Sequence, residues 1–461
     1  MIAHETHTAS GFYSPEAFMA FRTAVQGPIL LPDAAGYDQA RKVWNAMIDR
    51  RPCLIVQCIN TADVVHAVNF ARTQQLPVAI RGGAHNAAGL AVCDNGLVID
   101  LSLMKEIVVD PATMTARAQG GVLWGEFDQA TQQHGLATTG GVVTTTGIAG
   151  LTLGGGIGWL MGKYGLSCDN LLSVEIVTAD GQVRTASRTQ NEDLFWAVRG
   201  AGGNFGVVTS FEYQLHRVGK VLGGMVLHPI SRAKEVLQFY REFTATAPDE
   251  LTTYAGALTS PDGHPMLAIV LCYCGADMEE GERLIAPVRQ FGPPMVDMLR
   301  PMPYLEQQTL FDAAAPHGLQ SYWKANQLDG LTDEAIDTFV KYVSPISSPR
   351  TAVLIEHHHG AMSRVDPEAT AFRHREECYD LVILSLWTDP KDSPTHVRWT
   401  REFFEAMKPF YRHGVYVNAL SDDEGNDRVR AAYGVNYDRL VELKRLYDPA
   451  NLFRINNNIV P

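Results

Sequence analysis

The chain has 461 residues, of which 46% are hydrophobic and 19% are charged. This composition is ordinary for a globular protein and excludes wholesale disorder, collagen and coiled coil. At roughly 150 residues per domain, the length fits three units or two large ones. The 51 Asp and Glu residues outnumber the 38 Lys and Arg residues, so the net charge is −13. DNA or RNA is therefore not expected as a partner, because a surface that binds a polyanion carries the opposite charge.

The first residues, MIAHETHTAS, lack the basic and apolar regions of a secretory signal. No stretch approaches ~18 consecutive apolar residues. We therefore expect no membrane partner and a cytoplasmic location. The seven cysteines follow no disulfide spacing and include no CxxC pair, so we expect reduced thiols and no structural zinc. The sequence carries no signal for an oligomeric state.

Short apolar segments dominate the first half of the chain. Residues 53–59 and 77–80 are predicted strands, and the apolar positions of 61–74 predict a helix between them, with Thr61 as its cap. Two further strands are predicted at 97–101 and 107–109. A β-α-β unit followed by short strands indicates an α+β domain.

Around Gly219 the pattern changes, because glycine becomes rarer and period-two alternation dominates. Strands are predicted at 251–259, 266–274, 320–328, 351–359 and 379–387, and helices at 232–246, 332–343 and 435–446, the last after the charged loop 421–427. Such alternation is typical of an antiparallel sheet. The second half is therefore expected to form a separate domain on such a sheet.

Clustered glycines between residues 120 and 206 suggest a loop that approaches a phosphate closely, with a dinucleotide as the obvious ligand. The Rossmann pattern G-x-G-x-x-G does not explain them. Gly156-Ile157-Gly158 is followed by glycine only at 162, which is one residue too far. A Walker A loop is also absent, since neither Gly-Lys pair is followed by Ser or Thr.

The segment 81–89, RGGAHNAAG, directly follows a predicted strand. It combines an arginine, several backbone amides and a histidine in one short turn. Arginine and amides together suit a pyrophosphate. The alternative is a glycine turn with a hydrogen-bonded histidine.

This segment resembles the pyrophosphate loop of FAD-linked oxidases of the vanillyl-alcohol-oxidase type. The resemblance continues through residues 139–158, 162–170 and 191–209, and it ends with 433–459, which is similar to the C-terminus of the berberine-bridge-enzyme-like branch. Within that branch the chain most resembles bacterial members such as 6-hydroxy-D-nicotine oxidase. The resemblance implies a two-domain, α+β FAD-binding fold with an antiparallel-sheet substrate domain. It places the FAD domain in 1–218, the substrate domain in 219–420 and a returning segment in 421–461.

The resemblance also implies which residues hold FAD. They are Arg81, Gly82, Gly83, Ala84, His85 and Asn86 in the first loop, Gly147, Ile148, Ala149, Gly150 and Leu151 in the second, Val208, and Asn456 and Asn458 in the tail. His85 matches the histidine that bonds to the flavin 8α carbon. Val143 stands where bicovalent members have a second, cysteine link, so the resemblance implies attachment through His85 only. Cys168 belongs to another motif and is expected to be a buried apolar cysteine.

The implied activity is that of an FAD-dependent oxidase, which removes a hydride from a CH–OH or CH–NH carbon of a sugar, alkaloid or polyketide-like molecule. Dioxygen is the expected acceptor, and the product is then H2O2. Tyr437, at the end of 433–437, resembles the family's catalytic tyrosine and is the candidate base. The alternative for Tyr437 is a structural role. The alternative functions are a dehydrogenase of the same fold and a flavin-binding protein without redox turnover.

Candidate substrate contacts come from the second domain. Tyr322, Lys324 and Asn326 share one face of a predicted strand, which either lines the substrate site or faces solvent. Arg364 stands where the plant enzymes have a catalytic Glu, and it either binds an anionic or carbonyl group or lies at the surface. The run 357–359, three histidines, lacks a convincing carboxylate spacing, so we expect no metal.

Overall fold

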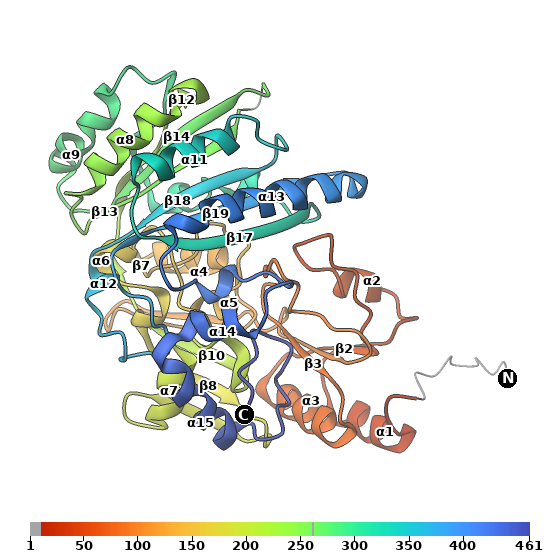
Figure 1. Cartoon of the computed structure of the whole chain (residues 1–461). Helices are drawn as coiled ribbons and strands as arrows, with labels where there is room; N and C mark the ends of the chain where they lie inside the picture. Colours follow the sequence, from red (N-terminus) through yellow and green to blue (C-terminus); the bar gives the residue numbers. More distant parts are fainter. Residues whose placement is uncertain (1–10, 261) are drawn as a thin grey trace.

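The computed structural model describes residues 11–260 and 262–461. Its helices and strands form two layers (Figure 1). The upper layer is one large sheet with helices above it, and the lower layer contains two smaller sheets. The first of these has the strand order β1-β2-β4-β3. Its strands are β1 (Ile29–Leu30), β2 (Leu54–Gln57), β3 (Val78–Arg81) and β4 (Leu97–Asp100).

Helix α3 (Thr61–Gln74) connects β2 to β3, and both strands pair in parallel with β4. Its buried positions include Val64, Val68 and Phe70, as the apolar spacing predicts. Phe70 stacks on Phe21 of helix α1 (Pro15–Ala24) with ring centroids 4.3 Å apart. The cap is Asn60 rather than Thr61, because the Asn60 side chain accepts the N–H of Asp63.

The second small sheet is antiparallel, in the order β5-β6-β10-β8-β9. Its strands are β5 (Ile107–Asp110), β6 (Thr115–Gln119), β8 (Leu171–Val177), β9 (Val183–Ser187) and β10 (Val207–Gln214), and beside it lies the short pair β7 (Leu136–Ala137) and β11 (His216–Arg217). Several of these strands had no counterpart among the predicted elements.

The large sheet is also antiparallel, in the order β15-β12-β14-β13-β18-β19-β17, with β16 on β12. Its strands are β12 (Lys220–Pro229), β13 (Leu251–Thr259), β14 (Pro265–Tyr273), β15 (Val296–Asp297), β16 (Arg300–Pro303), β17 (Gln320–Leu328), β18 (Ala352–His358) and β19 (Cys378–Trp387). The five strands predicted in this half are all present, within one residue at each end.

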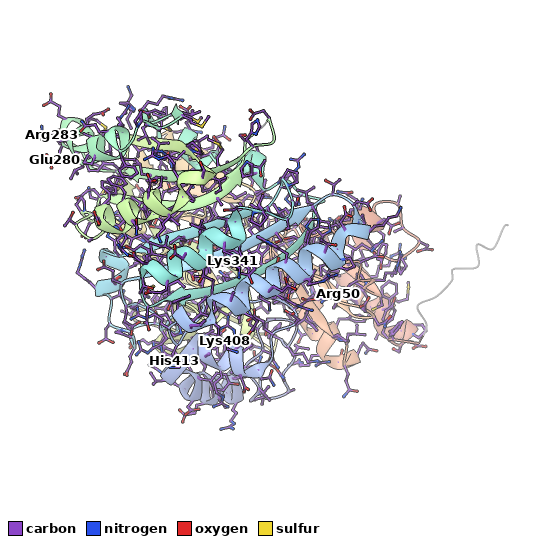
Figure 2. The ribbon with its side chains drawn as sticks, turned by 45° about the horizontal axis from the view of Figure 1, so that its top comes forward. Arg50, Glu280, Arg283, Lys341, Lys408 and His413 are labelled. Carbon is purple, nitrogen blue, oxygen red and sulfur yellow. The ribbon has the colours of Figure 1, made fainter. Side chains whose placement is uncertain are left out.

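Amphipathic helices cover the outer face of this sheet. They are α8 (Ala233–Thr244), α9 (Met278–Gln290), α11 (Asp333–Val343) and α13 (Ser393–Met407). Figure 2 shows α11, labelled at Lys341, beside α13, while Glu280 and Arg283 mark α9 at the far corner. The opposite face of the sheet looks toward the lower layer.

The remaining helices are short or lie in the lower layer. The α-helices are α2 (Tyr37–Ala40), α4 (Trp124–Gln132), α5 (Ile148–Leu153), α6 (Met161–Tyr164), α7 (Glu192–Val198), α10 (Tyr304–Gln308), α12 (Ala361–Arg364), α14 (Asn426–Tyr433) and α15 (Tyr437–Tyr447). The 3-10 turns are η1 (Ser167–Asn170), η2 (Gly202–Asn204), η3 (Ile230–Arg232), η4 (Asp312–Ala314), η5 (Pro390–Asp392), η6 (Lys408–Phe410), η7 (Val417–Ala419) and η8 (Gly434–Asn436).

The end of the chain returns to the lower layer, where α15 lies against α7. A fully buried lysine holds this segment in place. Lys444 Nζ donates to Asn204 O at 2.7 Å, to Phe453 O at 2.9 Å and to Asp448 at 2.7 Å. The three-part domain division stays a prediction, although the change of sheet between β11 and β12 falls near its first boundary.

Two further features concern the whole described chain. All seven cysteines are buried and none forms a disulfide. Among the described helices, none is both long and apolar enough to cross a membrane.

Candidate active site

A cavity of about 420 Å³ lies between the two layers. Its lower wall consists of loops, namely residues 82–87, 141–151 and 202–208 and the tail 453–457. Its upper wall consists of single side chains from four adjacent strands, β13, β18, β19 and β17. The two walls are therefore built in different ways.

The lower wall depends on glycines that bring two turns into direct contact. A Cβ on Gly83 would lie 2.3 Å from the backbone N of Gly147, and a Cβ on Gly147 would lie 2.4 Å from the backbone N of Gly83. No larger residue fits at either position. Gly150 and Gly202 also line the cavity, but a Cβ on either would meet no protein atom within 4 Å. These two glycines border open space that an elongated ligand can occupy.

His85 lies at one end of this wall, surrounded by aromatic rings. Trp44 stacks on it with centroids 5.0 Å apart, and His317 stands perpendicular to it at 6.0 Å. Burial, followed by the nearby His317, lowers the pKa of His85 to about 4, so the imidazole is neutral at pH 7. Its Nε2 is buried and has no hydrogen-bond partner among the described residues. A neutral imidazole with a free nitrogen fits a covalent partner.

On the upper wall, Glu356 of β18 and Asp380 of β19 stand directly opposite each other. Asp380 is 1% exposed, and neither of its carboxylate oxygens has a partner among the described residues. Burial raises the pKa of Asp380 to about 7. The nearby Glu356 adds to this rise, and His358 opposes it. Asp380 is therefore poised to exchange a proton near neutral pH.

His358 follows Glu356 by two residues in β18 and lies on the same face, with its Nε2 3.4 Å from Glu356 Oε2. Burial lowers the pKa of His358, but its interactions with Cys378 and Glu356 outweigh burial and hold the pKa well above its usual value. The charged imidazolium thus balances one of the two carboxylates. Ligand atoms of Glu356, His358 and Asp380 lie within 4.8 Å of one another, close enough to hold a cation. The absence of a metal stays a prediction.

Tyr416, just before η7, lines the same cavity. Its phenol oxygen accepts the backbone N–H of Gly156 at 3.1 Å and the Nδ2–H of Asn418 at 2.9 Å. Burial raises the pKa of Tyr416, and these two donors oppose the rise. Because the oxygen receives two hydrogen bonds, its own O–H is left to donate toward the cavity.

The relatives of the chain agree with this arrangement. Residues 52–187 match the model of the FAD binding domain, and 415–460 match that of the berberine and berberine-like proteins. The chain is 34% identical to an FAD-linked oxidoreductase of Dictyostelium discoideum, over 96% of each chain. It is 32% identical to (R)-6-hydroxynicotine oxidase of Paenarthrobacter nicotinovorans, over 96% of this chain and 98% of the relative.

Among solved structures, 6-hydroxy-D-nicotine oxidase from Arthrobacter nicotinovorans superposes with a TM-score of 0.88 at 30% identity, covering 95% of this chain and 98% of that one. The chain belongs to the berberine-bridge-enzyme-like family of FAD-linked oxidoreductases. This confirms the FAD-binding fold of the vanillyl-alcohol-oxidase type that the sequence motifs predict. The lower wall of the cavity is accordingly where this FAD-linked oxidoreductase would hold its cofactor.

Most residues that the sequence assigns to FAD binding line the cavity of the oxidoreductase. They are Gly82, Gly83, Ala84, His85, Asn86, Gly147, Ala149, Gly150, Leu151, Val208 and Asn456. Val143 and Thr146 lie in the same wall. That these residues contact FAD stays a prediction, but the structure brings them together from four separate segments.

Three of the assigned residues do not line the cavity. The Arg81 guanidinium turns away and donates to the backbone oxygens of Ala40 at 2.8 Å and Lys42 at 2.6 Å, so it braces a loop rather than facing the ligand. Ile148 is fully buried in the core. In the tail, Asn457 lines the cavity where Asn458 was expected to.

The candidate base Tyr437 lies away from the cavity, and its role stays a prediction. Tyr437 begins α15 and is only 8% exposed, with Arg430 stacked on its ring at 4.3 Å and Tyr433 beside it. It is not among the described residues that line the cavity. Tyr416 lies there instead, in the sequence Tyr416-Val417-Asn418.

The predicted substrate contacts on β17 also face away from the cavity. Tyr322, Lys324 and Asn326 do share one face, but Trp323, on the opposite face, lines the cavity. Tyr322 Oη donates to Asp423 at 2.6 Å and Lys324 Nζ donates to it at 2.7 Å. These residues therefore fasten the segment after residue 420 to the sheet.

Arg364 is likewise not at the cavity, because it forms a surface ion pair with Asp249. Cys168 is fully buried, as expected. The sequence analysis missed the two carboxylates, Glu356 and Asp380. The signal for Glu356 was present, since alternation along β18 puts it on one face with Ala352 and Leu354, both of which line the cavity.

Proposed function

We propose that this oxidoreductase is an oxidase that removes a hydride from a CH–OH or CH–NH carbon of a small molecule and forms hydrogen peroxide from dioxygen. The observation that carries the proposal is the buried carboxylate of Asp380, which lines the cavity without a partner among the described residues. It is on the wall opposite the glycine turns. FAD, when bound on those turns, supplies the hydride acceptor.

The residues of the upper wall then accept and donate protons and exclude water. Asp380, once ionised, accepts the proton that the substrate's hydroxyl or amine must lose as the hydride leaves. Tyr416 donates its free O–H to the same substrate atom and orients it. Leu354, Val382 and Leu384 line the cavity beside them and keep the site apolar.

We also propose that His85 alone is covalently bound to the flavin. The unpartnered Nε2 of His85 and its stacking on Trp44 support this link. Val143 in the cavity wall, where other members have a cysteine, supports the absence of a second link. The seven reduced cysteines support a cytoplasmic location.

The substrate is proposed to be a sugar, an alkaloid or a polyketide-like compound, and the relative named 6-hydroxynicotine oxidase supports the alkaloid group. The test is a panel of alcohols and amines added to the protein without oxygen. A substrate should bleach the yellow flavin, and readmitted oxygen should restore the colour and yield peroxide. Recovery only with an artificial quinone acceptor would indicate a dehydrogenase. A flavin that no compound bleaches would indicate a binding protein without turnover.

A further inference from the structure

The charged side chains that line the cavity are acidic. Among the described residues that line it, Glu356 and Asp380 are the only charged side chains, and no lysine or arginine faces the same space. They stand opposite each other on neighbouring strands, where like charges repel. Such a pair calls for a positive charge between or beside the carboxylates.

The protein places one imidazole, that of His358, beside the two carboxylates. His358 lies 3.4 Å from Glu356 and also acts on Asp380, so one imidazolium stands against two carboxylates. Arg428, whose charge also reaches Asp380, is held by Glu424 at 2.9 Å and by Asn326 at 2.7 Å. Asp380 therefore keeps two oxygens that have no partner in the described part of the chain, although only 1% of the residue is exposed. A buried carboxylate in this state favours a cationic ligand.

The aromatic rings in the cavity wall provide a second, independent argument for a cationic ligand. Tyr254, Phe311, Trp323 and Tyr416 all line the cavity that the two carboxylates face. Trp159 stacks on Tyr254 at 4.8 Å and fixes its ring. Ring faces carry partial negative charge and attract organic cations, most strongly where water is excluded.

We infer that the cavity selects an organic amine that binds as its ammonium cation, which narrows the proposed function from alcohols and amines to amines and rests on it. In the reaction the ammonium N–H proton passes to the Asp380 carboxylate. The neighbouring C–H bond then breaks, and its electron pair and hydrogen leave as a hydride to the flavin. The nitrogen lone pair forms the C=N bond, so the amine is oxidised to an iminium ion and the flavin is reduced. Dioxygen then takes up the two electrons, the hydride's hydrogen and the proton that Asp380 releases, and it leaves as hydrogen peroxide.

Binding of a matched pair of probes tests this inference without turnover. 4-(Trimethylammonio)phenol is a cation, and 4-tert-butylphenol is its neutral isostere, and neither has an amine N–H to lose. Titration of the flavin absorbance of the holoprotein gives each dissociation constant. We expect the cation to bind about tenfold more tightly. Asp380→Asn and Glu356→Gln should each weaken binding of the cation and leave binding of the neutral probe unchanged.

The preference should also grow as pH rises through about 7, because Asp380 must be ionised. Glu356, His358 and Arg428 are the charged groups that act on it. Asp249→Asn, which removes a surface carboxylate paired with Arg364, is the control and should keep the preference. Equal binding of both probes, or a preference that survives Asp380→Asn, overturns the inference. A protein that contains no flavin would instead defeat the proposed function, so the two failures are distinguishable.

Discussion

The two walls of the cavity are formed by different parts of the chain, the lower wall by backbone turns and the upper wall by side chains of a sheet. The lower wall is made of contiguous turns, in which glycines such as Gly83 and Gly147 let one backbone lie against another. The upper wall is made of isolated side chains, such as Glu356 and Asp380, that come from different strands. The lower wall is thus specified by short stretches of sequence, whereas the upper wall exists only once the strands have paired.

This difference separates the proposed cofactor site from the proposed substrate site. The proposed FAD site consists of backbone turns, whose sequence pattern is recognisable. The proposed substrate site consists of side chains from the sheet. Changes in the lower wall should therefore affect flavin content, and changes in the upper wall should affect turnover while flavin is retained.

The largest effect is expected for Gly83→Val compared with Gly150→Ala. A side chain at residue 83 collides with the backbone of Gly147, so we expect loss of bound flavin and a free energy of unfolding lower by about 1–3 kcal/mol. At Gly150 no protein atom is within 4 Å of the added Cβ, so stability should be kept while FAD binding weakens. Thermal melts and flavin absorbance measure both quantities. Equal losses of stability in the two variants would contradict the distinction between a glycine required by a backbone contact and a glycine that borders open space.

The next effect concerns turnover. Asp380→Asn should retain flavin but lower kcat/KM by about 10²-fold, the usual effect of losing a general base. In the parent protein kcat/KM should rise with pH through about 7, because the ionised Asp380 accepts the proton. The rise should be absent in the variant, while Asp262→Asn, an exposed change, should keep it. An unchanged profile would show that another group accepts the proton.

A smaller effect separates the two tyrosines. Tyr416→Phe removes the O–H that faces the cavity and should lower the rate of anaerobic flavin bleaching by about 10–100-fold. Tyr437→Phe, in the core of the lower layer, should change it less than about 2-fold, since the tyrosine does not reach the substrate. The reverse result would restore Tyr437 as the base.

The sequence predicted the fold and the lower wall well for a physical reason. Alternation along 251–259 and 320–328 predicts both strands with the bounds that the structure has. It does not determine which face of β17 meets the cavity, because both faces are largely buried and only the pairing of Trp323 with Leu384 of β19 decides it. The direction of the Arg81 side chain was likewise not predictable, since a motif gives the position of a residue but not where its side chain points.

The smallest effect comes from the back of the sheet, where Asp423 accepts hydrogen bonds from Tyr322, Lys324 and Arg401. Burial opposes ionisation of Asp423, but the bonds from Lys324 and Tyr322 outweigh it and lower its pKa to about 2. The unfolded value is about 4, so the stability that Asp423 contributes is present above pH 4 and is lost as the pH falls toward 2. Melting curves should show Asp423→Asn less stable at pH 6, with the difference shrinking below pH 4. Flavin content should not change.

The most direct test of the account is mass spectrometry of the tryptic peptide of residues 82–105, which begins after Arg81, ends at Lys105 and contains His85. The account predicts that this peptide carries one flavin and that fragmentation places the flavin on His85. It also predicts that His85→Ala abolishes the modification. An unmodified peptide from a yellow protein, or a flavin on Cys93 or on a peptide without His85, would contradict it.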